Sequence, residues 1–236
     1  RTVALVAFEG VAEAVAAVAA WRSALDSLEA AELVLAGGVE LVCQAFDLRP
    51  PFARPWPAYV VAEVADHRDP TDDLSAVVAA SAGVGDVAVA TDAAHRASLW
   101  RYREDHTLAI NTLGPPHKFD VSVPLGAVAD IADSVAGAIA SARPAARTWI
   151  FGHVGDGNLH VNVSGLPPDD QGIDEVVLRH IAEAGGSISA EHGIGTAKRR
   201  WLHLTRSADE LAAQRAVKAA LDPYGILNPH VLLPPP

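Results

Sequence analysis

The stretch GHVGDGNLHVNV at residues 152–163 constrains the fold of this chain more than any other part of the sequence. Its centre, Asp156-Gly157, is a strong β-hairpin signal, because a type I′ turn needs positive φ at both central positions. Around that centre we expect His153 to lie directly opposite His160, with the Cβ atoms of such a pair about 4.5–5.5 Å apart. The sequence therefore predicts an antiparallel hairpin that carries both imidazoles on one face.

Two imidazoles on one face of a sheet suit a metal ion such as zinc, which accepts histidine nitrogen at about 2.0–2.1 Å. Strand alternation places Asn162 on the same face as His160, while the apolar residues between them point to the other face. A polar face that begins with two histidines indicates a ligand site. The alternative is a pair of sheet histidines that bind each other or the backbone.

The segment SISAEHGIGTAKRR at 187–200 supplies a third candidate ligand, Glu191, at the end of an expected short strand over 187–190. Two histidines and one carboxylate form a three-ligand site with an open position, as in catalytic zinc centres. The neighbouring His192 is a candidate general base. The alternative for Glu191 is a helix-start role near positive amide ends.

The order of expected elements predicts an α+β fold: ferredoxin-like antiparallel sheets covered by helices, with a C-terminal helical tail. In the second half, the expected strands and helices follow the order β-α-β-β-α-β: 118–123, 125–142, 147–154, 159–164, 173–184 and 187–190. The first half is expected to alternate similarly: strand 2–8, helix 9–26, helix 28–42, loop 49–57, strand 58–66, helix 69–82, strand 86–90 and a helix through 103. We expect a domain over 1–206, with two subdomains divided near 110, and a helical tail over 207–236.

The composition excludes several classes of protein. A net charge of −11 argues against nucleic-acid binding, because phosphates need a cationic patch. The single cysteine, Cys43, excludes an internal disulfide and a cysteine-based zinc cluster. We find no apolar run of the length of a membrane span and no signal peptide, which favours the cytoplasm and leaves peripheral membrane association open. The start at Arg1 and the absence of methionine suggest a fragment of a longer protein.

Two cationic side chains are candidate clamps for a carboxylate. Arg103 lies four residues before Thr107 on an expected helical face, and guanidinium binds carboxylates bidentately. The alternative for Arg103 is a surface ion pair with Glu104 or Asp105. Lys118 opens the KFDVSVP strand, and a solvated strand end is its alternative. The residues alone therefore predict a metal site for a small anion, without naming a reaction.

Several motifs together carry a resemblance to a known family: GHVGDGNLHVNV, SAEHGIG, KFDVSVP, the W-x-x-RE of 100–104 and LDPYGILNP at 221–229. The chain resembles the C-terminal domain of FAD-linked oxidases of the vanillyl-alcohol-oxidase type, in the branch of D-2-hydroxyacid dehydrogenases. That branch includes enzymes acting on D-2-hydroxyglutarate, D-lactate and glycolate. The resemblance extends over nearly the whole chain.

The resemblance implies a role for each candidate residue. A divalent metal, zinc or alternatively iron or manganese, would be held by His153, His160 and Glu191. His192 would take the proton of the substrate hydroxyl while the C2 hydride passes to FAD. The substrate would be bound by Arg103, Thr107, Lys118 and Asn162, and Asn228 in the tail would return toward the flavin.

The family also binds FAD mainly through an N-terminal domain, and no G-x-G-x-x-G or Walker A motif occurs here. We therefore expect the substrate- and metal-binding half of a flavoenzyme, inactive alone, whose partners are a 2-hydroxy acid and that FAD domain. D-2-hydroxyglutarate or D-lactate is the favoured substrate. The electron acceptor and the oligomeric state, including a homodimer, are not specified by the sequence. The alternative function is a metal-containing module that binds a small acid without redox chemistry.

Overall fold

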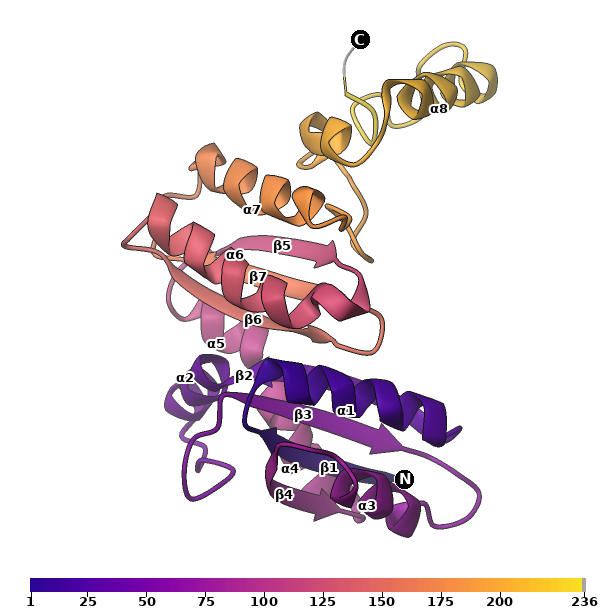
Figure 1. Cartoon of the computed structure of the whole chain (residues 1–236). Helices are drawn as coiled ribbons and strands as arrows, with labels where there is room; N and C mark the ends of the chain where they lie inside the picture. The colour runs from indigo at the N-terminus through magenta and orange to yellow at the C-terminus, as the bar shows by residue number, and fades with distance from the viewer. Residues whose placement is uncertain (235–236) are drawn as a thin grey trace.

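The computed structural model describes residues 1–234 and contains a seven-stranded sheet in the order β4-β1-β3-β2-β6-β7-β5, with antiparallel neighbours throughout (Figure 1). The strands are β1 (Thr2–Phe8), β2 (Leu28–Leu35), β3 (Ala58–Val64), β4 (Val84–Ala90), β5 (His117–Ser122), β6 (Arg147–His153) and β7 (Asn158–Ser164). The helices are α1 (Val11–Ala24), α2 (Ala36–Phe46), α3 (Thr71–Ala79), α4 (Ala93–Glu104), α5 (His106–Asn111), α6 (Val128–Ala142), α7 (Gln171–Glu183) and α8 (Ala208–Leu221), with 3-10 turns η1 (Leu125–Ala127) and η2 (Arg199–Leu204). The predicted α+β class, an antiparallel sheet covered by helices, is confirmed.

The sheet consists of two units with the same topology. In the first unit, strands β1 to β4 lie in the order β4-β1-β3-β2, which is the split βαβ arrangement. In the second unit, β5, β6 and β7 repeat it, and a bridge between Ser122 and Ser187 takes the place of the fourth strand. Of the strand predicted over 187–190, only Ser187 forms a strand pairing, so the prediction is wrong for residues 188–190. The backbone N–H groups of residues 190–192 donate to a side chain instead of to a strand.

The helix predicted over 28–42 is wrong over residues 28–35, which form strand β2, while residues 36–42 lie in helix α2 as predicted. Its alanine, leucine and glutamate residues favour a helix locally, but tertiary pairing overrides that preference. Strand β2 pairs with β3 on one side and with β6 on the other. The β2–β6 ladder places Glu32 opposite His153 and joins the two units into one sheet.

Each face of the sheet buries a different set of side chains. One face packs against α1, α3, α6 and α7, and this core runs through both units. The opposite face of the first unit packs against α2, α4 and α5. In the second unit, Trp149 and Phe151 of β6 extend this core. The strands β5 and β7 carry polar side chains on the same face, and these form the site described below.

The segment Leu125–Ala142, which includes α6, has the length and mean hydropathy of a membrane-crossing helix. This finding corrects the expectation that no apolar stretch reaches that length. In the fold, α6 contacts α1, α7 and β6. Its apolar face, which includes Val135 and Ile139, belongs to the core of the domain.

The C-terminal helix α8 matches the helix predicted over 208–221. It begins with a capping box, in which Ser207 and Glu210 satisfy each other's backbone N–H groups. Figure 1 shows α8 beyond α7, away from the seven-stranded sheet.

Candidate metal and substrate site

Strand alternation gives both β5 and β7 one apolar side and one polar side. On β7, Leu159, Val161 and Val163 are fully buried in the core. His160 and Asn162 point to the other face, as the sequence predicts. On β5, Asp120 pairs with His160 and Lys118 pairs with Asn162, so all of these polar side chains share that face.

The hairpin register differs from the prediction by two residues. Phe151, rather than His153, lies opposite His160. The type I′ turn is also wrong: in the turn, the N–H of Asp156 donates to the carbonyl of His153 at 3.2 Å, and only Gly157 has positive φ. Because a shift of two residues preserves the face of a strand, the imidazoles of His153 and His160 still meet, with ring centroids 5.5 Å apart.

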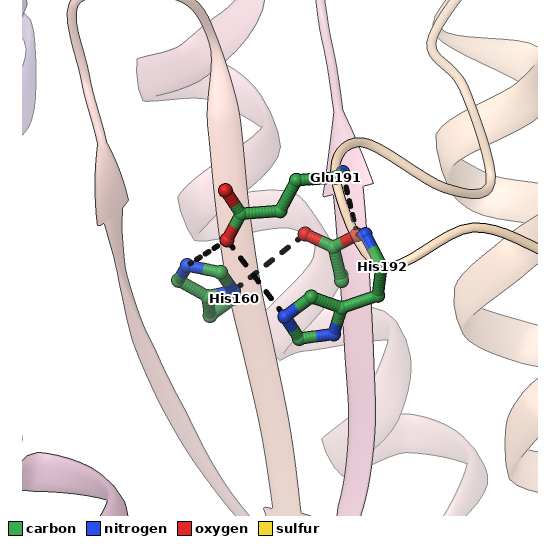
Figure 2. A group of neighbouring side chains, drawn as sticks. His160, Glu191 and His192 are labelled. Atoms are coloured by element: carbon green, nitrogen blue, oxygen red, sulfur yellow. Dashed lines mark hydrogen bonds and ion pairs between the residues drawn. The ribbon is translucent and has the colours of Figure 1, made fainter.

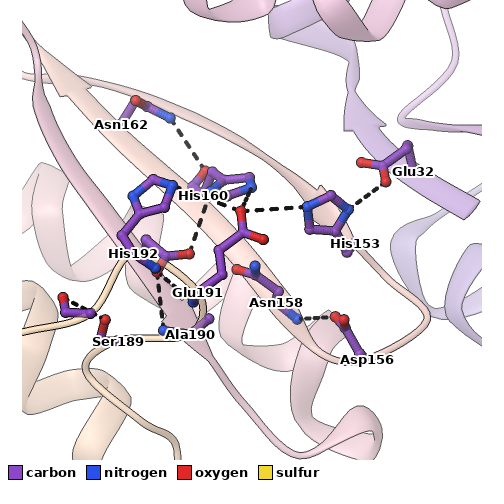
Figure 3. A network of polar contacts seen from close by, with 12 residues as sticks. Glu32, His153, Asp156, Asn158, His160, Asn162, Ser189, Ala190, Glu191 and His192 are labelled. Atoms are coloured by element: carbon purple, nitrogen blue, oxygen red, sulfur yellow. Dashed lines mark hydrogen bonds and ion pairs between the residues drawn. The ribbon is translucent and has the colours of Figure 1, made fainter. Parts of the chain in front are cut away.

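The carboxylate of Glu191 lies at the centre of the site. Its Oε1 atom is 3.7 Å from the Nε2 atoms of His153, His160 and His192 (Figures 2 and 3). Two tetrahedral ligands about 2.0–2.1 Å from a zinc ion would be about 3.3 Å apart. The nitrogen and oxygen donors around Glu191 therefore suit a divalent metal. His153 lies 3.7 Å from Glu191, as His160 and His192 do, but this predicted ligand is not among the residues whose ligand atoms all lie within 4.8 Å of one another.

The predicted ligand group omitted Asp120, which is only 2% exposed. Its Oδ2 accepts the backbone N–H groups of Ala190, Glu191 and His192 at 3.1, 2.9 and 2.8 Å. Within the described residues its Oδ1 has no hydrogen-bond partner. Strand alternation could have found Asp120, because it lies two residues after the predicted Lys118 and on the same face of the strand. Potential ligand atoms within 4.8 Å of one another come from Asp120, His160, Glu191 and His192.

The environment sets the charge of two groups in this cluster. Burial raises the pKa of Asp120, but the hydrogen bonds from the backbone of His192 and Glu191 outweigh it, so the pKa lies below its usual value and the side chain is anionic. Burial lowers the pKa of His160, and the positive charge of Arg103 lowers it further. A neutral imidazole is the form that binds a metal.

A buried glutamate, Glu32, connects two of the predicted site residues. Its Oε2 accepts a hydrogen bond from Nε of Arg103 at 2.8 Å, and its Oε1 lies 2.5 Å from Nδ1 of His153 (Figure 3). The surface ion pair considered for Arg103 is therefore not its main contact. The guanidinium also lies 4.6 Å from the centre of the Phe151 ring. Sequence reasoning missed Glu32 because its segment was assigned to a helix.

These side chains surround a cavity of about 260 Å³. Arg103 and Thr107 do not share a helix as predicted, since they lie on α4 and α5, but both line the cavity. Asn228 is exposed in the tail, with φ of 45°, and does not line it. The lining residues are Arg103, Thr107, Lys118, Phe119, Asp120, Phe151, His153, His160, Asn162, Glu191 and His192.

Comparisons with known proteins show the family to which the chain belongs. The family model described as FAD linked oxidases, C-terminal domain, matches residues 1–232. The chain is 37% identical to a D-2-hydroxyglutarate dehydrogenase of Xanthomonas citri pv. viticola, covering 89% of this chain and 47% of that protein. It is 32% identical to a mitochondrial D-2-hydroxyglutarate dehydrogenase of Arabidopsis thaliana, covering 92% and 40%.

A solved structure with a similar fold is that of an alkyldihydroxyacetonephosphate synthase, with a TM-score of 0.57, 12% identity and coverage of 97% of this chain and 43% of that chain. At that identity the likeness concerns the fold alone. The chain spans less than half the length of the two dehydrogenases named above.

Proposed function

Because the chain belongs to the family FAD linked oxidases, C-terminal domain, we propose that it is the substrate- and metal-binding part of an FAD-dependent D-2-hydroxyacid dehydrogenase. The observation that carries the proposal is the single carboxylate oxygen of Glu191, 3.7 Å from three imidazole nitrogens in a cavity that two cationic side chains also line. The FAD would be bound mainly by a further, N-terminal domain of the same protein.

In this proposal His153, His160 and Glu191 hold a divalent metal, with zinc favoured and iron or manganese as alternatives. When bound, the metal lowers the pKa of the substrate's 2-hydroxyl group, and FAD accepts the hydride from C2. His192 accepts the hydroxyl proton. Its side chain is 61% exposed at the rim of the site, where a flavin-bearing domain can approach the substrate.

The substrate carboxylates are assigned to the cationic residues of the cavity. Arg103 would bind one carboxylate, with Thr107 and Asn162 adding hydrogen bonds, and this contact fixes C2 relative to the flavin. Lys118 would bind a second carboxylate. Since two cations match a dicarboxylate and the relatives are named for D-2-hydroxyglutarate, we propose that acid ahead of D-lactate.

The names of the relatives bear on the cellular compartment. One relative is a bacterial enzyme, and the name of the other places that protein in mitochondria.

The test uses the full-length protein reconstituted with FAD. D-2-hydroxyglutarate, D-lactate and glycolate are titrated with an artificial electron acceptor, before and after chelation, in the parent and in His153→Ala. We expect flavin reduction by D-2-hydroxyglutarate that is lost on chelation and in the variant. Flavin reduction that survives both changes contradicts the metal role. Binding of the acid without flavin reduction supports the non-redox module instead.

A further inference from the structure

We propose that Glu32 is a positioning residue that orients the metal ligand His153 and the carboxylate clamp Arg103 together. This inference rests on the function proposed above and adds a residue to it. Glu32 touches neither substrate nor metal in the proposed site. It acts through its two partners, each of which it contacts with a different carboxylate oxygen.

The Glu32 side chain is only 8% exposed, so its charge needs partners. Arg103, whose side chain is 12% exposed, donates through Nε at 2.8 Å. His153 contacts the other oxygen through Nδ1 at 2.5 Å. Removing the carboxylate group would leave a largely buried guanidinium and an imidazole without their shared acceptor.

The contact with His153 determines which of its nitrogens can bind a metal. An ionised carboxylate is an acceptor only, so the Nδ1 atom of a neutral His153 must carry the hydrogen. The Nε2 atom is then the unprotonated one, and it lies 3.7 Å from Glu191 on the cavity side. A carboxylate behind a metal-binding histidine fixes its tautomer and ring orientation in this way.

The contact with Arg103 leaves the bidentate edge of the guanidinium for a ligand. Glu32 is bound through Nε, while the two Nη groups form the fork that matches a carboxylate. The ring of Phe151 supports the same guanidinium at 4.6 Å. Glu32 therefore sets the direction in which Arg103 presents its donors.

Glu32 connects the two units of the sheet through its side-chain contacts. Glu32 comes from β2 of the first unit, and its ladder partner His153 comes from β6 of the second. Arg103 lies on α4, which contacts β2. The carboxylate of Glu32 thus fixes the positions of Arg103 and His153 relative to each other across the β2–β6 ladder.

The first experiment compares Glu32→Gln with the parent chain by competition for Zn²⁺ with a chromophoric chelator. A glutamine that keeps accepting from Arg103 presents its NH₂ group to His153, which favours the tautomer with hydrogen on Nε2. We expect the affinity for Zn²⁺ to fall about 10- to 100-fold.

Glu63→Gln is the matched control. Glu63 lies on the adjacent strand β3 and contacts Arg1 and the ring nitrogen of Trp100, also from α4. It does not line the cavity. We expect this variant to bind Zn²⁺ within twofold of the parent.

The second experiment measures the tautomer of His153 directly, first in the parent chain. Nitrogen-15 chemical shifts of the imidazoles, recorded on the metal-free parent at pH 8, report the tautomer of His153. We expect the Nδ1–H form, and we expect Glu32→Gln to shift the population toward Nε2–H. A merely structural role for Glu32 would leave the tautomer unchanged.

Two results overturn the proposal: a predominant Nε2–H form of His153 in the parent, or a folded Glu32→Gln variant that binds Zn²⁺ as tightly as the parent. If Glu32→Gln does not fold, the tautomer of His153 in the parent still tests the proposal. If the parent does not bind Zn²⁺, that result contradicts the proposed metal site and not the role of Glu32. The tautomer of His153 then tests the role of Glu32 by itself.

Discussion

The carboxylate of Asp120 accepts the backbone N–H of His192 at 2.8 Å, so a buried side chain on β5 anchors a turn that lies 72 residues later in the chain. The same oxygen accepts the N–H groups of Ala190 and Glu191. A loop is fixed here by a side chain rather than by a strand ladder. The position of Glu191 against the hairpin histidines depends on that anchor.

Replacing Asp120 by alanine should loosen this turn and destabilise the fold. The change removes a buried charged acceptor and the hydrogen bonds of three backbone N–H groups to it, so we expect the free energy of unfolding to fall by about 2–4 kcal/mol. Urea denaturation measures the change. Asp133→Ala, an exposed position on α6, is the control and should stay within about 0.5 kcal/mol of the parent.

Lys118 should discriminate between dicarboxylates and monocarboxylates. It lies two residues from Asp120 along β5, a rise of about 6.4–6.8 Å, and lines the same cavity. In the full-length enzyme, we expect Lys118→Ala to raise KM for D-2-hydroxyglutarate about 10- to 100-fold and to leave KM for D-lactate nearly unchanged. Steady-state kinetics with both acids measure the difference. An equal rise for both acids would show that Lys118 does not bind the distal carboxylate.

Gly157 should tolerate no side chain. Its φ of 80° favours glycine, and an added Cβ would lie 2.1 Å from the carbonyl oxygen of Val123. We expect Gly157→Ala to lower the free energy of unfolding by about 1–3 kcal/mol and to weaken Zn²⁺ binding, because the turn carries His153. Gly137→Ala in α6 meets no atom within 4 Å and should instead stabilise by about 0.5–1 kcal/mol. Thermal or urea unfolding compares the two.

His106 should make stability depend on pH. Burial, followed by the charge of Arg103, lowers the pKa of His106 from 6.5 to about 4. Between these values the unfolded chain binds a proton that the folded chain does not, so stability is complete above pH 6.5 and falls as pH drops toward 4. The loss from this group is about 3 kcal/mol over that window.

Urea denaturation at pH 7.5 and pH 5 tests this contribution. We expect the difference in unfolding free energy between the two pH values to shrink in His106→Phe. The exposed His67→Gln variant is the control and should keep the dependence of the parent. An unchanged difference in His106→Phe would mean that another group carries the pH dependence.

The alternation of polar and apolar residues was enough to predict the polar face of the hairpin. It did not predict the register, because a four-residue turn at 154–157 replaces the expected tight turn and shifts His160 opposite Phe151. Because the register differs by an even number of residues, His153 and His160 still lie on the same face of the sheet. An odd shift would have turned His160 into the core.

The segment around Glu32 shows where local reasoning fails. Its composition is that of a helix, and only the neighbouring strands β3 and β6 make it a strand. Those partners lie far away in the sequence, so no local pattern could indicate that Glu32 faces His153. The same limit applies to Asp120, whose role as an anchor depends on a turn that folds back from residues 190–192.

The short β2–β6 ladder, which pairs only residues 32–34 with 151–153, has a mechanical consequence. Among the described strands, this ladder is the pairing that joins the two units, and the proposed ligand would span it, bound by Arg103 on one side and by His160 on the other. Because a ligand that binds only the native arrangement stabilises it, substrate and metal should stabilise this junction. We expect slower amide hydrogen exchange along β2 and β6 when both are bound.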